Sequence, residues 1–233
     1  MKPNFQRKAA LTAGISLLVM VVAAGFSFGF VYSELVVPGV GKATFDNLSQ
    51  NTGLFAAGVG GWILIFILDL IVSIALYRFF KTVHRVRSLI TAAIRIIYSL
   101  VLAVAIFYLW KALELSISAT TPSESAYISL MDYLNQFEQI WSNGLIIFGL
   151  HLVGLGILAW RAEFIHKIWG VLLLLAGVCY TFVHIGRLFP KFVSTVDLIE
   201  PYLVIPMTVG ELGFAIWLIA KGGKSNREVE GAN

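Results

Sequence analysis

Four ionisable residues lie near the middle of four different hydrophobic segments: Asp69, Arg95, His151 and Glu211. Ionisable side chains are costly at bilayer depth, and they persist there when they face the protein interior and find partners. Two carboxyl groups, a guanidinium and an imidazole can supply an ion pair and a pair of groups that exchange a proton. We therefore expect these residues to form one polar cluster, the candidate site of this sequence.

The four residues lie at similar distances in sequence from basic residues that flank their segments. These distances are nine residues from Asp69 to Arg78, eight from Arg87 to Arg95, and ten both from His151 to Arg161 and from Glu211 to Lys221. At the rise of a helix, each residue lies roughly 12–15 Å from its flanking base. Antiparallel helices would thus bring all four side chains to one level.

Two pairs are expected within this cluster. Asp69 and Arg95 fall in consecutive segments, so a direct ion pair between them is natural, and its simplest role is structural. His151 and Glu211 either exchange a proton or only form a hydrogen bond between helices. Pro206, five residues before Glu211, removes a helical donor and predicts a kink beside that acid.

Three further residues are candidates for the same cluster. Tyr98 lies one turn from Arg95, and Tyr180 lies one turn from His184. They extend the cluster outward or act as interfacial anchors and core aromatics. The histidines and acids show no HxxxH or HExxH spacing, so no metal site is predicted.

No common cofactor or nucleophile motif occurs in the sequence. Walker, dinucleotide-binding, GxSxG and CxxC patterns are absent, so we expect no cofactor. Cys179 is the only cysteine, which excludes an intramolecular disulfide and a cysteine metal cluster.

The composition is that of a membrane protein. Of the 233 residues, 58% are hydrophobic and 13% are charged, with a mean hydropathy of +0.85; soluble domains are about a quarter charged. Apolar runs long enough to cross a bilayer recur at residues 10–32, 54–77, 88–110, 144–160, 168–188 and 202–220. We therefore predict an all-α, polytopic six-helix transmembrane bundle, a single domain over residues 1–233 with a polar tail at 221–233.

The basic residues are distributed unevenly between the two sides of this arrangement. Twelve fall on one side: Lys2, Arg7, Lys8, Arg78, Lys81, Arg85, Arg87, Arg161, Lys167, Lys221, Lys224 and Arg227. Four fall on the other side: Lys42, Lys111, Arg187 and Lys191. This bias predicts a multi-pass protein of the cell membrane with both termini in the cytoplasm. The net charge of +4 then reflects topology, and no nucleic-acid partner is expected.

The segments outside the spans also carry signals. Pro38-Gly39 predicts a turn, and residues 45–51 a short helix. Gly25 and Gly29 have the spacing that lets two helices pack closely. Residues 111–143 contain apolar side chains at three- and four-residue steps: Tyr127, Met131, Leu134, Phe137 and Trp141. This pattern predicts an amphipathic outer helix that runs into the fourth span, as a packing extension or as a lid.

Several motifs together resemble one protein family. They are Leu35-Val36-Val37-Pro38-Gly39, Phe148-Gly149-Leu150-His151, Gly170 to Gly177 and Gly210-Glu211-Leu212. The chain resembles, over essentially its whole length, the prokaryotic domain-of-unknown-function 4386 family of six-span membrane proteins. The FGLH and GEL motifs of that family fall here on His151 and Glu211. The resemblance implies the fold and no particular activity.

Three classes of function remain open. The first is binding or movement of a small or lipid-like ligand, with the polar cluster as the floor of its site. The second is an intramembrane enzyme that uses His151 and Glu211 as acid and base on a lipid. The third is a structural or partner-binding membrane protein. We favour the first, with membrane lipids as its surroundings and a small hydrophobic or amphipathic ligand; the oligomeric state stays open.

Overall fold

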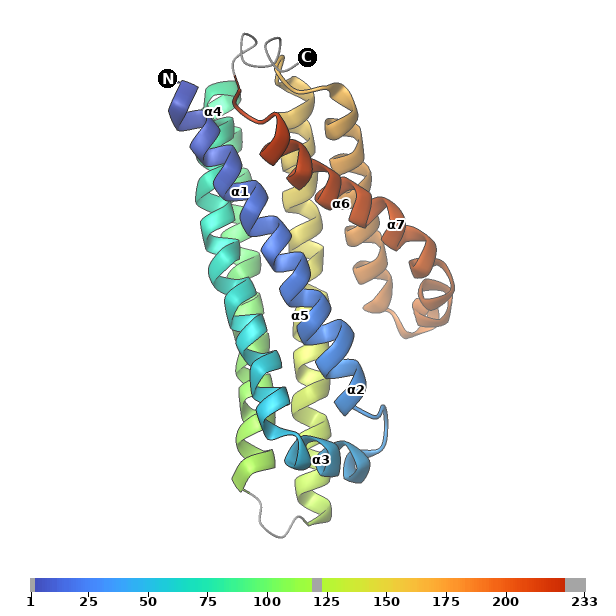
Figure 1. Ribbon diagram of the computed structural model, residues 1–233. Coiled ribbons are helices and arrows are strands. Elements are labelled where there is room, and N and C mark those ends of the chain that lie inside the picture. Colours follow the sequence, from blue (N-terminus) through green and yellow to red (C-terminus); the bar gives the residue numbers. More distant parts are fainter. Residues whose placement is uncertain (1–2, 119–122, 225–233) are drawn as a thin grey trace. The chain divides into compact units, whose positions relative to one another are not determined.

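The computed structural model describes residues 3–118 and 123–224, and within these ranges the chain is helical and has no strand (Figure 1). The elements are α1 (Pro3–Ala24), a π-helix η1 (Gly25–Tyr32), α2 (Ser33–Leu35), α3 (Gly41–Gln50), α4 (Thr52–Ser118), α5 (Glu124–Arg161), α6 (Lys167–Arg187) and α7 (Pro190–Ala220). Over the described residues, five helical stretches are long and apolar enough to cross a membrane: Phe5–Leu35, α4, α5, α6 and α7. The chain therefore has the helices of a multi-pass membrane protein.

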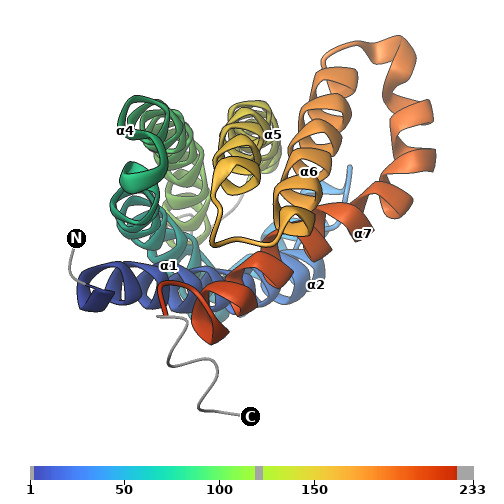
Figure 2. The ribbon, with the colours of Figure 1, turned by 90° about the horizontal axis from the view of Figure 1, so that it is seen from above.

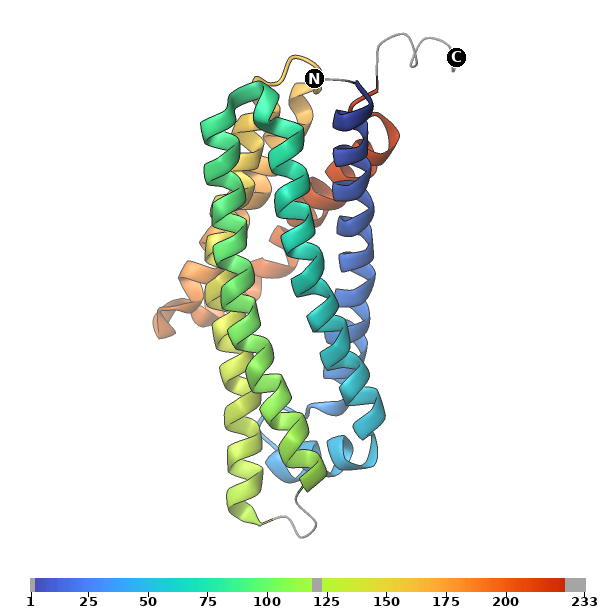
Figure 3. The same cartoon turned by 90° about the vertical axis from the view of Figure 1, so that its left-hand side faces the viewer.

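Helix α4 turns back on itself at His84. This residue has φ −161° and ψ 104°, which are extended and not helical. Its Nδ1 accepts a hydrogen bond from the backbone N–H of Arg87 at 3.3 Å, so the side chain caps the returning helix. Residues 52–83, the first arm, and residues 85–118, the second arm, consequently run antiparallel (Figure 3). Helix thus continues beyond the predicted spans 54–77 and 88–110 on both sides of His84.

The chain forms two compact units. Unit 1 contains the described residues of 1–19, 68–99 and 143–233, and unit 2 those of 20–67 and 100–142. Helices α1, α4 and α5 contribute residues to both. All seven candidate site residues belong to unit 1.

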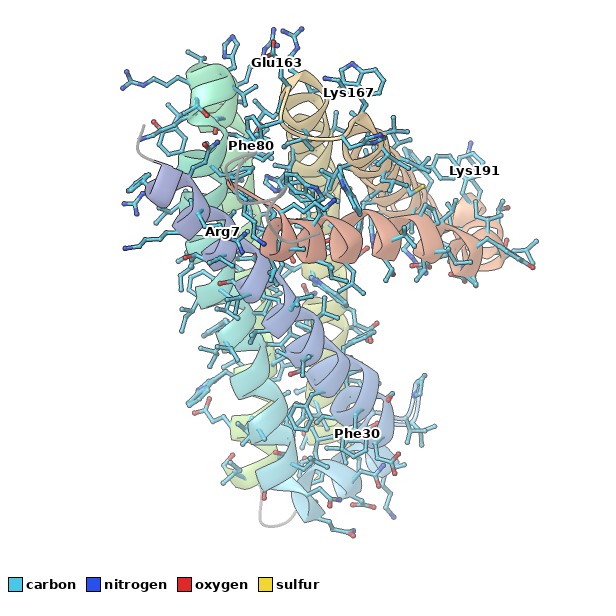
Figure 4. The ribbon with its side chains drawn as sticks, turned by 45° about the horizontal axis from the view of Figure 1, so that its top comes forward. Arg7, Phe30, Phe80, Glu163, Lys167 and Lys191 are labelled. Atoms are coloured by element: carbon cyan, nitrogen blue, oxygen red, sulfur yellow. The ribbon has the colours of Figure 1, made fainter. Side chains whose placement is uncertain are left out.

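One end of unit 1 gathers four segments: the start of α1, the turn of α4, the connection from α5 to α6, and the end of α7 (Figure 3). Ten of the twelve basic residues predicted for one side lie in these described segments; Lys2 and Arg227 lie outside the described residues. Arg7 joins two of the segments, because Nη1 donates to Leu218 O at 3.1 Å and to Gly222 O at 2.9 Å. Its Nη2 donates to Ile219 O at 2.6 Å (Figure 4). The Arg7 cation thereby satisfies carbonyl groups at the C-terminus of α7.

Buried serines connect the two arms of α4 in unit 1. Ser73 Oγ donates to Ala92 O at 2.8 Å, and Ser88 Oγ donates to Tyr77 O at 3.1 Å. Each bond joins one arm to the backbone of the other, so their rotation about the helix axes is fixed. This rotation decides which side chains face each other deeper in the unit.

Glycines bring α5 and α6 into close contact (Figures 1 and 2). A Cβ on Gly177 would lie 2.6 Å from Gly149 O, and a Cβ on Gly156 would lie 2.9 Å from Gly170 O. The two contacts are seven residues apart on both helices, which is two helical turns. Gly210 packs α7 onto α6 in the same way, because its Cβ would lie 2.8 Å from Leu172 O. Backbones approach closely only where no side chain intervenes.

The core of unit 2 is aromatic. Trp62 has ring centroids 4.9 Å from Trp141 and 5.1 Å from Phe137, and Phe28 lies 4.9 Å from Trp141. Tyr32 Oη donates to Glu138 Oε1 at 2.7 Å. The apolar stripe predicted on residues 111–143 thus faces this core, with Leu134 and Phe137 buried. In the structure this stripe and the fourth predicted span belong to one helix, α5.

Two expectations for unit 2 have different outcomes. The predicted turn is present, with Gly39 at φ +74°, a conformation that favours glycine. The prediction that Gly25 and Gly29 pack closely against another helix of the same chain is wrong, because a Cβ on either would meet nothing within 4 Å among the described residues. Both lie in the π-helix η1, whose wider turns no longer align residues four apart on one face.

Replacing Gly177 with Ala should destabilise the protein, because the new Cβ would overlap the Gly149 carbonyl oxygen. Overpacking of this kind costs about 1–3 kcal/mol. Thermal unfolding of the purified protein in detergent measures the loss. The control is Gly60→Ala in α4, because a Cβ on Gly60 would meet nothing within 4 Å. Alanine there should leave the stability unchanged or raise it. Equal stability of the two variants would contradict the close α5–α6 contact.

Candidate functional site

Asp69 and Arg95 form an ion pair between the two arms of α4. Arg95 Nη2 lies 2.5 Å from Asp69 Oδ1, and the two side chains are 1% and 0% exposed. The other carboxylate oxygen, Asp69 Oδ2, and the guanidinium nitrogen Arg95 Nε have no hydrogen-bond partner among the described residues. The pair neutralises both charges inside the unit and retains unused hydrogen-bonding capacity.

His151 connects this pair to α5. Its Nε2 lies 3.2 Å from Arg95 Nη1, and its Nδ1 lies 2.9 Å from the carbonyl oxygen of Thr91. A guanidinium can only donate and a carbonyl can only accept. His151 therefore carries its proton on Nδ1 and accepts at Nε2, so the geometry defines a neutral imidazole with both nitrogens engaged.

Close contact between α5 and the second arm of α4 allows His151 to reach both Arg95 and Thr91. A Cβ on Gly154 would lie 2.6 Å from Thr91 Oγ1, so α5 approaches the second arm of α4 within one turn of His151. The backbone of Thr91 is thereby within reach of the imidazole. The glycine that follows His151 by three residues is thus part of what positions it.

An aromatic side chain lies beside the cation. The Arg95 Cζ is 5.3 Å from the centroid of the Phe148 ring, a distance typical of a cation–π contact. The same ring lies 5.0 Å from Tyr98 and 5.3 Å from Tyr180. Phe148 thus connects the charged residues to both predicted tyrosines. It was not predicted as a site residue, although it lies one turn before His151 in the FGLH motif.

Glu211 lies at the less enclosed edge of the cluster. Tyr180 on α6 is hydrogen-bonded to the Glu211 carboxyl on α7, and both side chains are half-buried. The Tyr180 and His184 rings stack with centroids 6.3 Å apart, and His184 is buried. Asp69, Arg95 and His151 are by contrast almost fully enclosed.

The structure therefore brings the seven predicted residues into one cluster but pairs them differently. The expected direct contact of His151 with Glu211 is replaced by contacts of His151 with Arg95 and Thr91 and of Glu211 with Tyr180. Proton exchange within a His151–Glu211 pair has no geometric basis. In the described part of the chain, no group of three His, Cys, Asp or Glu side chains could hold a metal ion.

Helix α7 curves between its start and its end (Figure 2). It contains Pro201 and Pro206, each of which lacks the N–H that would bond to the carbonyl one turn earlier. Gly210 packs against α6 directly before Glu211. The acid thus follows a weakened stretch of helix and a tight contact.

Replacing Arg95 with Leu should strongly destabilise the protein, because it leaves the Asp69 carboxylate buried without a countercharge. Removing one partner of a buried pair costs about 3–5 kcal/mol. The double variant Asp69→Leu, Arg95→Leu should recover much of that loss, as measured by thermal unfolding in detergent. A double variant no more stable than Arg95→Leu would contradict a coupled pair.

Comparisons with known proteins place this helical architecture in a family. An uncharacterized protein of Archaeoglobus fulgidus is 28% identical over 169 residues, which cover 72% of this chain and 86% of the relative. No solved structure matches the chain. The profile of the family described as Domain of unknown function (DUF4386) matches residues 12–222. The chain belongs to this family.

Proposed function

We propose that the chain is a six-span protein of the cell membrane, with both termini in the cytoplasm, and that the spans act as a single transmembrane domain. The turn of α4 at His84 supports six crossings, since its two arms run antiparallel. The basic residues gathered at one end of unit 1 support the orientation. Residues 124–142 of α5 would form the outer interfacial part of the fourth span.

The same proposal assigns the polar cluster to a small amphipathic or lipid-like ligand. The observation that carries it is the difference in exposure within one network: Arg95 is enclosed, whereas Glu211 and Tyr180 are half-buried. A carboxyl and a phenol can accept from and donate to a polar head. Val204, two turns before Glu211 on the same face of α7, is 46% exposed. This side chain would contact the apolar body of the ligand.

The other two functional classes fit the geometry less well. An intramembrane enzyme with His151 as acid or base needs a nitrogen free to face a substrate, and both nitrogens of His151 are engaged. A purely structural role suits Asp69, Arg95 and His151. It does not explain why an acid lies at the less enclosed edge of the cluster, five residues after Pro206 in α7.

The proposed topology predicts opposite sides for positions 123 and 224. Reporter fusions that are active only in the cytoplasm should be active after Lys224 and inactive after Ser123, because the two positions lie on opposite sides of a six-span chain. Activity assays in intact cells distinguish the outcomes. The same result at both positions would refute the six-span arrangement.

Replacing Glu211 with Gln should preserve folding and weaken ligand retention. Gln keeps the shape and accepts from Tyr180, whereas a charge-assisted bond to a ligand head, worth about 1.5–3 kcal/mol, is lost. We expect roughly a tenfold or larger drop in small molecules retained through purification, measured by mass spectrometry of extracts. Asp197→Asn is the control, because Asp197 lies on the same helix and pairs with Arg187. Identical extracts from all three proteins would argue for a structural cluster.

A further inference from the structure

A hollow in unit 1 lies between α1 and the first arm of α4, at the basic end. Its volume is about 260 Å³, and its lining comes from one face of each helix. The lining residues are Phe5, Lys8, Ala9 and Thr12 on α1 and Ile71, Ile74, Ala75 and Arg78 on α4. On both helices they are spaced by three, one and three residues, which is the repeat of a single helical face. Two antiparallel stripes thus border one groove.

The positive charges of this groove gather at one part of it. Lys8 and Arg78 line it, and Arg78 Cζ and Lys81 Nζ lie 5.8 Å and 5.5 Å from the centroid of the Phe5 ring. The ring of Phe5 holds these two cations next to each other. None of the three bases forms an ion pair within the described residues, and the lining contains no carboxyl group. The site therefore carries uncompensated positive charge.

The remaining wall of the groove is apolar. Ile71 and Ile74 are 38% and 51% exposed, and Ala9 and Ala75 form the buried floor. Ile71 lies two turns from Arg78 along α4, so the apolar wall extends roughly 10 Å away from the bases toward the middle of the helix. An occupant that uses both parts has an anionic head and a hydrocarbon body.

We propose that this groove binds an anionic phospholipid of the leaflet at the basic end, with its phosphate against Lys8 and Arg78 and an acyl chain along Ile71 and Ile74. Basic pockets between transmembrane helices recognise anionic headgroups in this way. A free phosphate would leave the apolar wall unused. The hollow does not include Glu211, so a test of lipid binding there is independent of the function proposed for the polar cluster.

The test is retention of dioleoyl phosphatidylglycerol by the purified full-length protein, measured by native mass spectrometry against dioleoyl phosphatidylcholine. Wild type should retain phosphatidylglycerol preferentially. Lys8→Gln with Arg78→Gln should reduce that retention about tenfold or more, since two phosphate contacts are lost. Ile74→Trp should reduce it as well without a change of charge, because the larger side chain occupies the groove.

A matched double variant controls for general electrostatics. Arg85→Gln with Arg161→Gln removes two exposed bases of unit 1 that do not line the hollow, and it should retain phosphatidylglycerol within about twofold of wild type. Equal losses in the two double variants would overturn the proposal in favour of diffuse attraction. The proposal is also overturned if glycerol phosphate displaces phosphatidylglycerol and the Ile74→Trp variant retains as much of this lipid as wild type. That combination would show a site for free anions. Thermal unfolding of each variant verifies that it is folded.

Discussion

The burial of the Arg95 guanidinium is the constraint on which unit 1 depends. A permanently charged group that is 1% exposed is stable in a membrane-spanning helix only if the protein supplies its counterion and acceptors. Three side chains provide them: Asp69 from the first arm of α4, and His151 and the face of the Phe148 ring from α5. Each contact requires a fixed rotation of its helix, so one side chain defines how three helical segments face each other.

Close backbone approach makes those contacts reachable. A side-chain hydrogen bond spans about 3 Å, whereas helices separated by large side chains lie 8–10 Å apart at their axes. In unit 1, glycines precede or follow the polar residues: Gly149 and Gly154 flank His151, and Gly210 directly precedes Glu211. Gly149 and Gly210 contact backbone atoms of α6, and Gly154 contacts the Thr91 side chain, so the polar groups come within reach of one another. The glycines of the family motifs therefore position the site as much as its polar residues do.

The cluster is predictable from the sequence, but not all of its pairs are, for a geometric reason. Counting residues from the flanking bases gives depth along a helix, and similar depth on consecutive segments is enough to predict that Asp69 contacts Arg95. It gives no rotation about the axis, where each residue turns by about 100°. The partners of His151 depend on that rotation, which the contact of Gly154 with Thr91 sets. The same limit explains Gly25 and Gly29, because a spacing of four predicts one face only in an α-helix and η1 is a π-helix.

The network divides into a fixed part and a part that can change. Asp69 and Arg95 cancel each other's charge, and His151 is neutral because both of its hydrogen bonds require it. The net charge of the cluster is then decided by Glu211, which lies within electrostatic reach of Arg95 and Asp69. When ionised, Glu211 adds an uncompensated negative charge at the half-buried edge, where desolvation is costly. A proton, or the cationic or hydrogen-bond-donating head of a ligand, removes that charge. This asymmetry is why the chemistry of an occupant is specified at Glu211 and not deeper in the cluster.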